Sequence, residues 1–366
     1  MSPKKRPLSA DRVLLCTLGP SSLNERIISQ LDEIGVNTFR INMSHTDVAD
    51  LERIIHFIQR RTKIPISIDT EGARLRTGPM ADGVVVTAGA KVRLVPEAFW
   101  GDVFTIPITP GNAIAQLEPN ARMSIDFDSV ILRIDKVSEG TAEATVLSGG
   151  EIGTRRAVTA LPSPELPTFS EKDRVAARIA LANGVHEFAL SFCERRESVD
   201  QLREMIGANN TIVSKIESRE GVRNLVDITK STDKVLIDRG DLSREVRIEA
   251  IPLLQKAIIR TANARGTPVY VATNLLESMV TRRTPSRAEV NDVINTLLDG
   301  ANGLVLAAET AIGKYPVEAA RMISSLMREY GRAANGYHLD ELLGDHPLAA
   351  FGPPKETKTP ARDFGS

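Results

Sequence analysis

The chain has 366 residues, of which 42 % are apolar and 25 % are charged, a composition typical of soluble globular proteins with two or three domains. Its 46 basic and 47 acidic side chains leave a formal charge of −1, which argues against a nucleic-acid or membrane partner. The two cysteines are too few for a disulfide framework, and no apolar run approaches the ~20 residues that a membrane-spanning helix needs. We therefore expect a cytoplasmic protein without a secretory signal.

The start of the chain alternates between short apolar runs and amphipathic segments. Strands are predicted at 12–19, 36–42 and 64–70, with helices between them at 21–35 and 48–61. The alternation resumes after residue 168 and predicts five more strands, at 187–192, 211–217, 234–238, 268–273 and 303–308. The helices predicted in this second part include 170–184, 198–207, 249–266, 286–300 and 316–331.

Strands that alternate with helices form parallel sheets with short crossovers. Eight such units favour a closed (β/α)8 barrel, formed by residues 11–78 and 167–335, over an open doubly wound sheet. Residues 79–166 alternate apolar and polar side chains with Gly and Asn at the turns, which predicts an inserted, β-barrel-like lid domain. The stretch at 336–366 is rich in proline, glycine and charge, and it predicts an irregular tail.

Polar residues gather where the predicted strands end. In a parallel barrel these ends meet at one mouth, where the active sites of such barrels lie. One polar residue there often only caps the next helix, but nearly every strand end is polar, with charges of both signs, which predicts a ligand site. The residues concerned are Arg40, Asn42, Asp69, Thr70, Ser191, Lys215, Glu217, Asp238, Asp241, Thr273 and Glu309.

The residue types at these positions indicate the chemistry. The carboxylates of Glu217 and Asp241 suit a hard divalent cation such as Mg²⁺ or Mn²⁺. Lys215 and Arg40 suit phosphoryl oxygens, and Gly240 leaves main-chain amides free to bind an anion. Together they fit phosphoryl transfer or the stabilisation of an enolate. The chain has neither a P-loop nor a dinucleotide-binding glycine motif, so a nucleotide would bind by other means.

A series of motifs carries a further signal: CTLGPSS, RINMSH, DTEGARLRTG, LPTFSEKD, SKIES followed by EGVRN, RGDL, VATNLLESM, PSRAEVNDV, LLDGANG and AAETAIGKYPVEA. In these motifs and in their order, the chain resembles pyruvate kinase across residues 11–332. The resemblance implies a barrel with an inserted lid, and an enzyme that acts on phosphoenolpyruvate or a related 2-oxoacid and on ADP or ATP.

The resemblance also implies roles for individual residues. Glu217 and Asp241 would hold the Mg²⁺, while Lys215 and Arg40 would stabilise the transferred phosphoryl group. Main-chain amides around Gly240 and Asp241, with the Thr273 hydroxyl, would receive the substrate carboxylate, and Thr273 would also lie on the route that protonates the enolate. The family's K⁺ site matches Asn42, Ser44, Asp69 and Thr70, and its nucleotide contacts match His45 and Arg76.

Several positions depart from the family's pattern. Glu71 and Arg74 stand where the family has lysine and glutamate, and the charge of Arg74 implies that K⁺ is not required. Asp238 replaces an alanine and places a new carboxylate beside the metal site, so we include it among the substrate-binding residues. Asn274 shortens a glutamine, and Ala307 removes a hydroxyl near the proton route. From the same resemblance we expect a protein without the family's C-terminal regulatory domain.

Three functions stay open at this point. The first is a phosphotransferase that acts between phosphoenolpyruvate and a nucleoside diphosphate. The second is a Mg²⁺-dependent enzyme that acts on a pyruvate-type enolate by aldol or decarboxylation chemistry. The third is a non-catalytic binding protein, against which the presence of Lys215, Glu217 and Asp241 argues. Because barrel helices pair between subunits in the family, we expect a homodimer.

Overall fold

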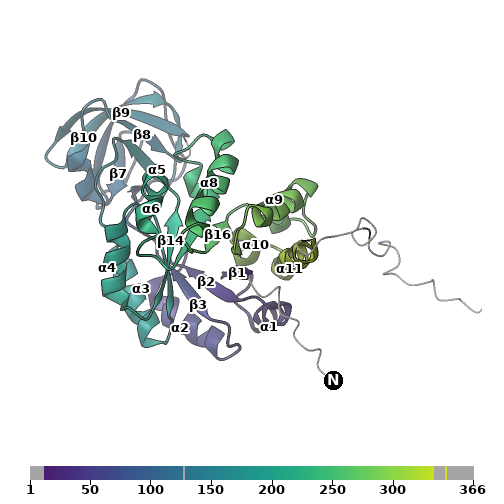
Figure 1. Ribbon diagram of the computed structural model, residues 1–366. Coiled ribbons are helices and arrows are strands. Elements are labelled where there is room, and N and C mark those ends of the chain that lie inside the picture. Colours follow the sequence, from purple (N-terminus) through teal and green to yellow (C-terminus); the bar gives the residue numbers. More distant parts are fainter. Residues whose placement is uncertain (1–11, 127, 334–342, 344–366) are drawn as a thin grey trace, which may run out of the picture.

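The computed structural model describes residues 12–126, 128–333 and 343, and its centre is a closed barrel of eight parallel strands (Figure 1). Around the barrel the strands follow the order β1-β17-β16-β15-β14-β13-β3-β2. Their bounds are β1 (Val13–Leu18), β2 (Thr38–Asn42), β3 (Ile66–Asp69), β13 (Glu187–Leu190), β14 (Thr211–Ile216), β15 (Lys234–Asp238), β16 (Val269–Ala272) and β17 (Gly303–Leu306). The predicted fold class, a (β/α)8 barrel with an additional β domain, is confirmed.

Helices surround the barrel, and local side chains define where they begin and end. Asn24 caps the first helix through its side chain, and Gly35 ends that helix in a left-handed conformation with φ of 93°. Ser170 and Asp173 form a capping box at the start of α3. The long helices are α1 (Glu25–Ile34), α2 (Val48–Gln59), α3 (Glu171–Ala182), α4 (Arg196–Ile206), α8 (Ile251–Asn263), α9 (Arg287–Leu298) and α11 (Pro316–Ala333).

Shorter helical pieces lie between these elements, several of them at the barrel mouth. Two of them, α5 and α6, follow β14 in place of one regular helix and were not predicted from the sequence. The short pieces are α5 (Arg219–Arg223), α6 (Leu225–Ile228), α7 (Arg239–Leu242), α10 (Ala308–Ala311), and the 3₁₀ helices η1 (Gly111–Gln116), η2 (Ile248–Ala250) and η3 (Glu277–Val280).

The apolar side chains of the barrel strands divide between its two faces. Those that point outward join the helices in one large buried cluster, which includes Phe39 and Phe188. Those that point inward form a smaller cluster that includes Leu15, Leu236 and Tyr270. Burial of this apolar surface supplies the main driving force for folding. Because the inward cluster fills the barrel interior, the polar residues at the strand ends are left to line its mouth.

The inserted segment forms sheets of its own, beside one end of the barrel in Figure 1. A seven-stranded sheet has the order β12-β8-β9-β10-β6-β7-β4, and β11 pairs with β5. A separate apolar cluster, which includes Leu94, Leu132 and Ile134, forms the core of this inserted segment. Its strands are β4 (Arg76–Thr77), β5 (Val84–Val86), β6 (Lys91–Pro96), β7 (Thr105–Thr109), β8 (Arg122–Ile125), β9 (Val130–Ser138), β10 (Thr141–Ser148), β11 (Gly150–Ile152) and β12 (Val158–Leu161).

The remaining sequence predictions concern the two cysteines, membrane segments and the tail. Cys16 and Cys193 are both buried and free. None of the helices in the described part of the chain is long and apolar enough to cross a membrane. The predicted tail at 336–366 lies outside the described residues apart from residue 343, and the domain boundaries at 79 and 166 stay predictions.

Candidate functional site

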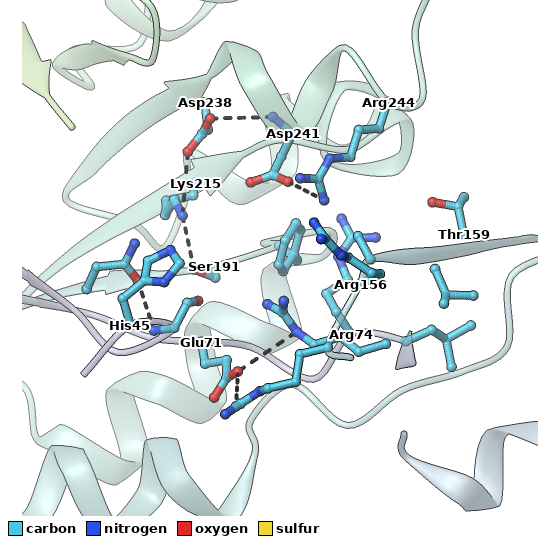
Figure 2. A pocket seen from close by; sticks show the side chains of 18 of the residues that line it. His45, Glu71, Arg74, Arg156, Thr159, Ser191, Lys215, Asp238, Asp241 and Arg244 are labelled. Atoms are coloured by element: carbon cyan, nitrogen blue, oxygen red, sulfur yellow. Dashed lines mark hydrogen bonds and ion pairs between the residues drawn. The ribbon is translucent and has the colours of Figure 1, made fainter. Parts of the chain in front are cut away.

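A cavity of about 360 Å³ opens at the barrel mouth, between the strand ends and the inserted sheet (Figure 2). Most of the predicted site residues line it, and they come from five barrel strands and the loops that follow them. The inserted domain contributes side chains from the opposite wall, including Arg155 and Arg156. A cavity of this size suits a small ligand or part of a larger one.

Three carboxylates converge beside this cavity, two of them in its lining and the third, that of Glu217, fully buried. Glu217, Asp238 and Asp241 each offer an oxygen within 4.8 Å of the others. The pairing of β14 with β15 explains why, because Ile216 is in register with Ile237 and the next residues of both strands therefore emerge side by side. The arrangement supplies the kind of oxygen ligands that Mg²⁺ prefers.

Glu217 is the most deeply buried of the three. Its Oε1 accepts a hydrogen bond of 2.7 Å from the main-chain amide of Phe192. Its Oε2 lies 3.2 Å from Lys215 Nζ, and it accepts no hydrogen bond from any described residue. Burial raises the pKa of Glu217 to about 8, although the Lys215 ammonium opposes this shift. A buried carboxylate oxygen without a hydrogen bond fits a position that a cation completes.

Lys215 lies at the centre of the charged groups. Its Nζ donates to Ser191 Oγ at 3.1 Å and lies 3.4 Å from Asp69 Oδ1 and 3.8 Å from Asp238 Oδ2. Burial alone would lower the pKa of Lys215, but the surrounding carboxylates outweigh burial and raise it. The ammonium is therefore a fixed positive charge at neutral pH. Figure 2 shows Asp238, Lys215 and Ser191 connected in one row.

Asp238 contacts the Thr273 hydroxyl and the Asp241 amide, the two groups predicted to receive the substrate carboxylate. Its Oδ1 accepts a hydrogen bond of 2.6 Å from Thr273 Oγ1 and one of 3.5 Å from the Asp241 amide. Burial alone would raise the pKa of Asp238, but the charge of Lys215 and the Thr273 hydroxyl lower it overall. Asp238 is therefore a carboxylate at neutral pH. Asp241 differs in being partly exposed, and its Oδ1 pairs with Arg244 at 3.0 Å.

The residues predicted to form a monovalent-cation site lie together at the ends of β2 and β3, but they bond mostly to protein groups. Asn42 Oδ1 accepts from the Ser44 amide at 2.9 Å. Arg40 forms a buried ion pair with Asp69. Thr70 Oγ1 donates to one main-chain group at the end of β13 and accepts from another, at 3.1 and 2.9 Å.

Arg74 lies in the same cavity, on its outer side. Its guanidinium stacks 3.4 Å from the centroid of the Phe192 ring, and Nη1 lies 3.4 Å from Glu245 Oε1. Arg74 thus contributes a positive charge to the cavity while its own contacts hold it beside Phe192.

His45 and Arg76, predicted to contact a nucleotide, both line the cavity, His45 from the loop after β2 and Arg76 from β4 of the inserted sheet. Partial burial, and then the positive charges of Arg76 and Arg40, lower the pKa of His45. The imidazole is therefore neutral at pH 7.

Glu71, which replaces the family's lysine, is surrounded by cations. It lies 3.9 Å from Arg76, 3.5 Å from Arg155 and 3.4 Å from Lys172, each distance joining a side-chain nitrogen to a carboxylate oxygen. Asp173 fixes the loop, because its carboxylate accepts hydrogen bonds from the Glu71 amide at 2.7 Å and from the next amide at 3.1 Å.

Several cavity residues were absent from the sequence predictions. Arg155 and Arg156 line the cavity from the inserted domain, and Arg244 lines it beside Asp241. The only signal in the sequence was the adjacent pair of arginines within a β-rich segment, and such a pair is common at solvated turns. Glu309, by contrast, was predicted at a strand end but bonds the main chain, accepting from the amides of Leu276 and Ala307 at 3.1 and 2.8 Å.

Comparisons with known proteins agree with this architecture. The family model for the barrel domain of pyruvate kinase matches residues 10–320. The pyruvate kinase of Thermoplasma acidophilum is 34 % identical over 319 residues, which are 86 % of this chain and 57 % of that protein. The pyruvate kinase of Methylorubrum extorquens is 36 % identical over 329 residues, which are 88 % of this chain and 69 % of that protein.

Among solved structures, a pyruvate kinase from Cryptosporidium parvum superposes with a TM-score of 0.80 at 28 % identity, covering 88 % of this chain and 70 % of that one. The match to the Thermoplasma protein, at 57 % of that protein, spans little more than half of its length. A family model that covers most of the chain, together with relatives above 30 % identity, establishes the relationship, and this chain belongs to the pyruvate kinase family.

Proposed function

We propose that the protein is a Mg²⁺-dependent phosphotransferase that acts between a phosphoenolpyruvate-type enol phosphate and a nucleoside diphosphate. The observation that carries the proposal is the group formed at the barrel mouth by the buried Lys215 and Glu217 and the partly exposed Asp241. It joins a fixed positive charge to a pair of carboxylates, and one oxygen of Glu217 accepts no hydrogen bond from the described residues. Phosphoryl transfer needs such charge neutralisation more than it needs a covalent nucleophile.

In this proposal, Glu217 and Asp241 hold the metal ion. A hard divalent cation would satisfy Glu217 Oε2 and remove the cost of burying its charge. When bound, Mg²⁺ polarises phosphoryl and enolate oxygens and neutralises their charge. Mn²⁺ prefers similar oxygen ligands and is an expected substitute.

The reaction breaks the bond between phosphorus and the enol oxygen and forms a bond between phosphorus and a terminal oxygen of the diphosphate. Lys215 and Arg40 lie close enough to Asp69 to share one charge network, and they would stabilise the transferred group. The enolate that is left takes a proton on carbon, and the hydroxyl of Thr273, just after the end of β16, would lie on the route of that proton. His45 and Arg76 would contact the nucleotide.

Three further expectations belong to the same proposal. K⁺ would not be required, because Arg74 supplies a positive charge inside the cavity. The protein would act as a cytoplasmic homodimer through its barrel helices. Residues 79–166 would close over the nucleotide, bringing Arg155 and Arg156 to its phosphates.

One observation favours a second candidate function. Asp238 adds a third carboxylate beside Glu217 and Asp241, where the metal would bind. This change would suit an enzyme that uses the metal and the enolate with a different electrophile or acceptor, as in aldol or decarboxylation chemistry.

A coupled assay separates the two candidates. Pyruvate formation from phosphoenolpyruvate is followed with lactate dehydrogenase, with and without ADP, at saturating Mg²⁺. Turnover that requires ADP supports the phosphotransferase. Pyruvate formed without ADP, or no pyruvate from either the wild type or Asp238→Ala, would reject it in favour of the second candidate.

A further inference from the structure

We propose that Asp238 is a specificity-determining residue whose carboxylate excludes a substrate carboxylate from the barrel mouth. The site would therefore select a phosphorylated substrate whose carbon part is neutral where it meets Thr273, such as an enol phosphate with a hydroxyl or carbonyl group there. This inference rests on the proposed phosphotransferase function and narrows its substrate class.

The hydroxyl group of Thr273 already has a hydrogen-bond acceptor within the protein. Asp238 Oδ1 accepts the Thr273 hydroxyl proton at 2.6 Å, a short hydrogen bond to a charged acceptor. The Asp241 amide points to the same oxygen at 3.5 Å. Asp238 therefore occupies the hydroxyl, and faces the amide, that the sequence analysis assigned to a substrate carboxylate.

The surroundings of Gly240 are tightly packed. A methyl group built on Gly240 would lie 2.8 Å from Thr273 Cγ2 and 3.4 Å from Asp238 Oδ1. Gly240, Thr273 and Asp238 are therefore packed closely where a side chain on residue 240 would extend. A carboxylate that bonded the Thr273 hydroxyl would have to displace the Asp238 side chain, which is 11 % exposed.

The negative charges around Lys215 also disfavour a further carboxylate. Around Lys215 lie the carboxylates of Asp69, Glu217 and Asp238, all of them buried. Asp69 is already paired with Arg40. Another carboxylate beside Asp238 would face a like charge within a few ångströms in a region of low dielectric, where repulsion is strong. A neutral oxygen would instead accept or donate a hydrogen bond without this repulsion.

The experiment measures the affinity of oxalate, a small dicarboxylate, by calorimetry in the presence of Mg²⁺. Asp238→Ala frees the Thr273 hydroxyl and removes the charge, so oxalate should bind at least about tenfold more tightly than to the wild type. Asp238→Asn keeps the shape and removes only the charge, and it should give a smaller gain. Because Asp238→Asn is nearly isosteric, it carries the test if Asp238→Ala does not fold.

Asp126→Asn is the matched control. Asp126 lines the same cavity from the inserted domain, where it pairs with Arg156 at 3.5 Å, and its φ of 51° suits asparagine. Equal oxalate affinity in the wild type and both Asp238 variants would overturn the proposal. So would an equal gain in Asp126→Asn, because it would assign the effect to the total charge of the cavity.

Turnover distinguishes this inference from the proposed function. A wild-type enzyme that turns over phosphoenolpyruvate with ADP, and whose KM for phosphoenolpyruvate is unchanged in Asp238→Ala, would overturn the inference and leave the proposed function standing. Tighter oxalate binding in Asp238→Ala, with no ADP-dependent turnover in any variant, would support the role of Asp238 while rejecting the proposed function.

Discussion

Arg239 donates two hydrogen bonds to the main-chain carbonyl oxygen of Thr273, from Nε at 3.1 Å and from Nη2 at 2.8 Å. Its Nη1 bonds both oxygens of Asp292, at 3.0 and 2.8 Å. Thr273 has a φ of 75°, a left-handed conformation that β-branched residues rarely adopt. The planar guanidinium thus ties this strained residue to α9 and positions its hydroxyl at the barrel mouth.

Arg239→Lys should therefore lower kcat while leaving the KM for ADP unchanged. A lysine cannot make the paired bonds to the Thr273 carbonyl, and misplacement of a reacting group by about 1 Å costs roughly a hundredfold in rate. Steady-state kinetics give both constants. Arg265→Lys is the control, because Arg265 is exposed and its guanidinium donates to the carbonyl of Thr261, near the end of α8. A rise in KM with kcat unchanged would contradict the positioning role.

Glu217→Gln should lower kcat by at least ~10³, the scale on which loss of a main electrostatic stabiliser acts. The amide keeps the shape of the side chain but offers a weaker ligand to a divalent cation. Calorimetry should show a parallel loss of Mg²⁺ affinity. Glu220→Gln, on α5 and paired with Arg223 at 3.2 Å, removes one carboxylate nearby on an exposed face. An active Glu217→Gln enzyme would show that the metal lies elsewhere.

Potassium should have little effect on the rate. Arg74 places a permanent positive charge in the cavity, and the oxygens of Asn42 and Thr70 already have protein partners. We expect less than about a twofold change in rate when K⁺ is added to an assay free of Na⁺ and K⁺. The reason is that Arg74 already supplies the positive charge that a bound K⁺ would add. Activation by several-fold would contradict the assignment. Arg74→Ala, measured in the same way, should become more dependent on K⁺.

The convergence of Lys215, Glu217 and Asp238 was predictable because it follows from the barrel alone. Alternating strands and helices predict parallel strands, and parallel strands bring their ends to one mouth. The hydrogen bond between Asp238 and Thr273 was not predictable, because it depends on side-chain orientation across two neighbouring strands. Nor were Arg155 and Arg156, which reach the cavity only through the docking of the inserted sheet against the barrel.

Glu289 offers a test of stability away from the carboxylate cluster. Its carboxylate accepts hydrogen bonds from the Ser278 amide at 2.6 Å and from the Ser286 amide at 2.6 Å, which ties η3 to the start of α9. Burial alone would raise the pKa of Glu289, but these hydrogen bonds and those of the serine hydroxyls lower it. The carboxylate is thus easier to ionise in the folded protein than in the unfolded chain.

The sign of the pH dependence follows from this difference. Above the unfolded value of 4.5 the stabilisation by Glu289 is fully present, and it is lost as the pH falls through the lower folded value. Glu289→Ala should lower the free energy of unfolding by about 1 kcal/mol near neutral pH, the usual cost of losing a cap, and by less as the pH drops below 4.5. Urea unfolding at a series of pH values measures both. Glu171→Ala, at the exposed start of α3, should change stability by less than about 0.5 kcal/mol. A Glu289→Ala deficit that stays constant across this range would mean that the carboxylate charge contributes nothing to the cap.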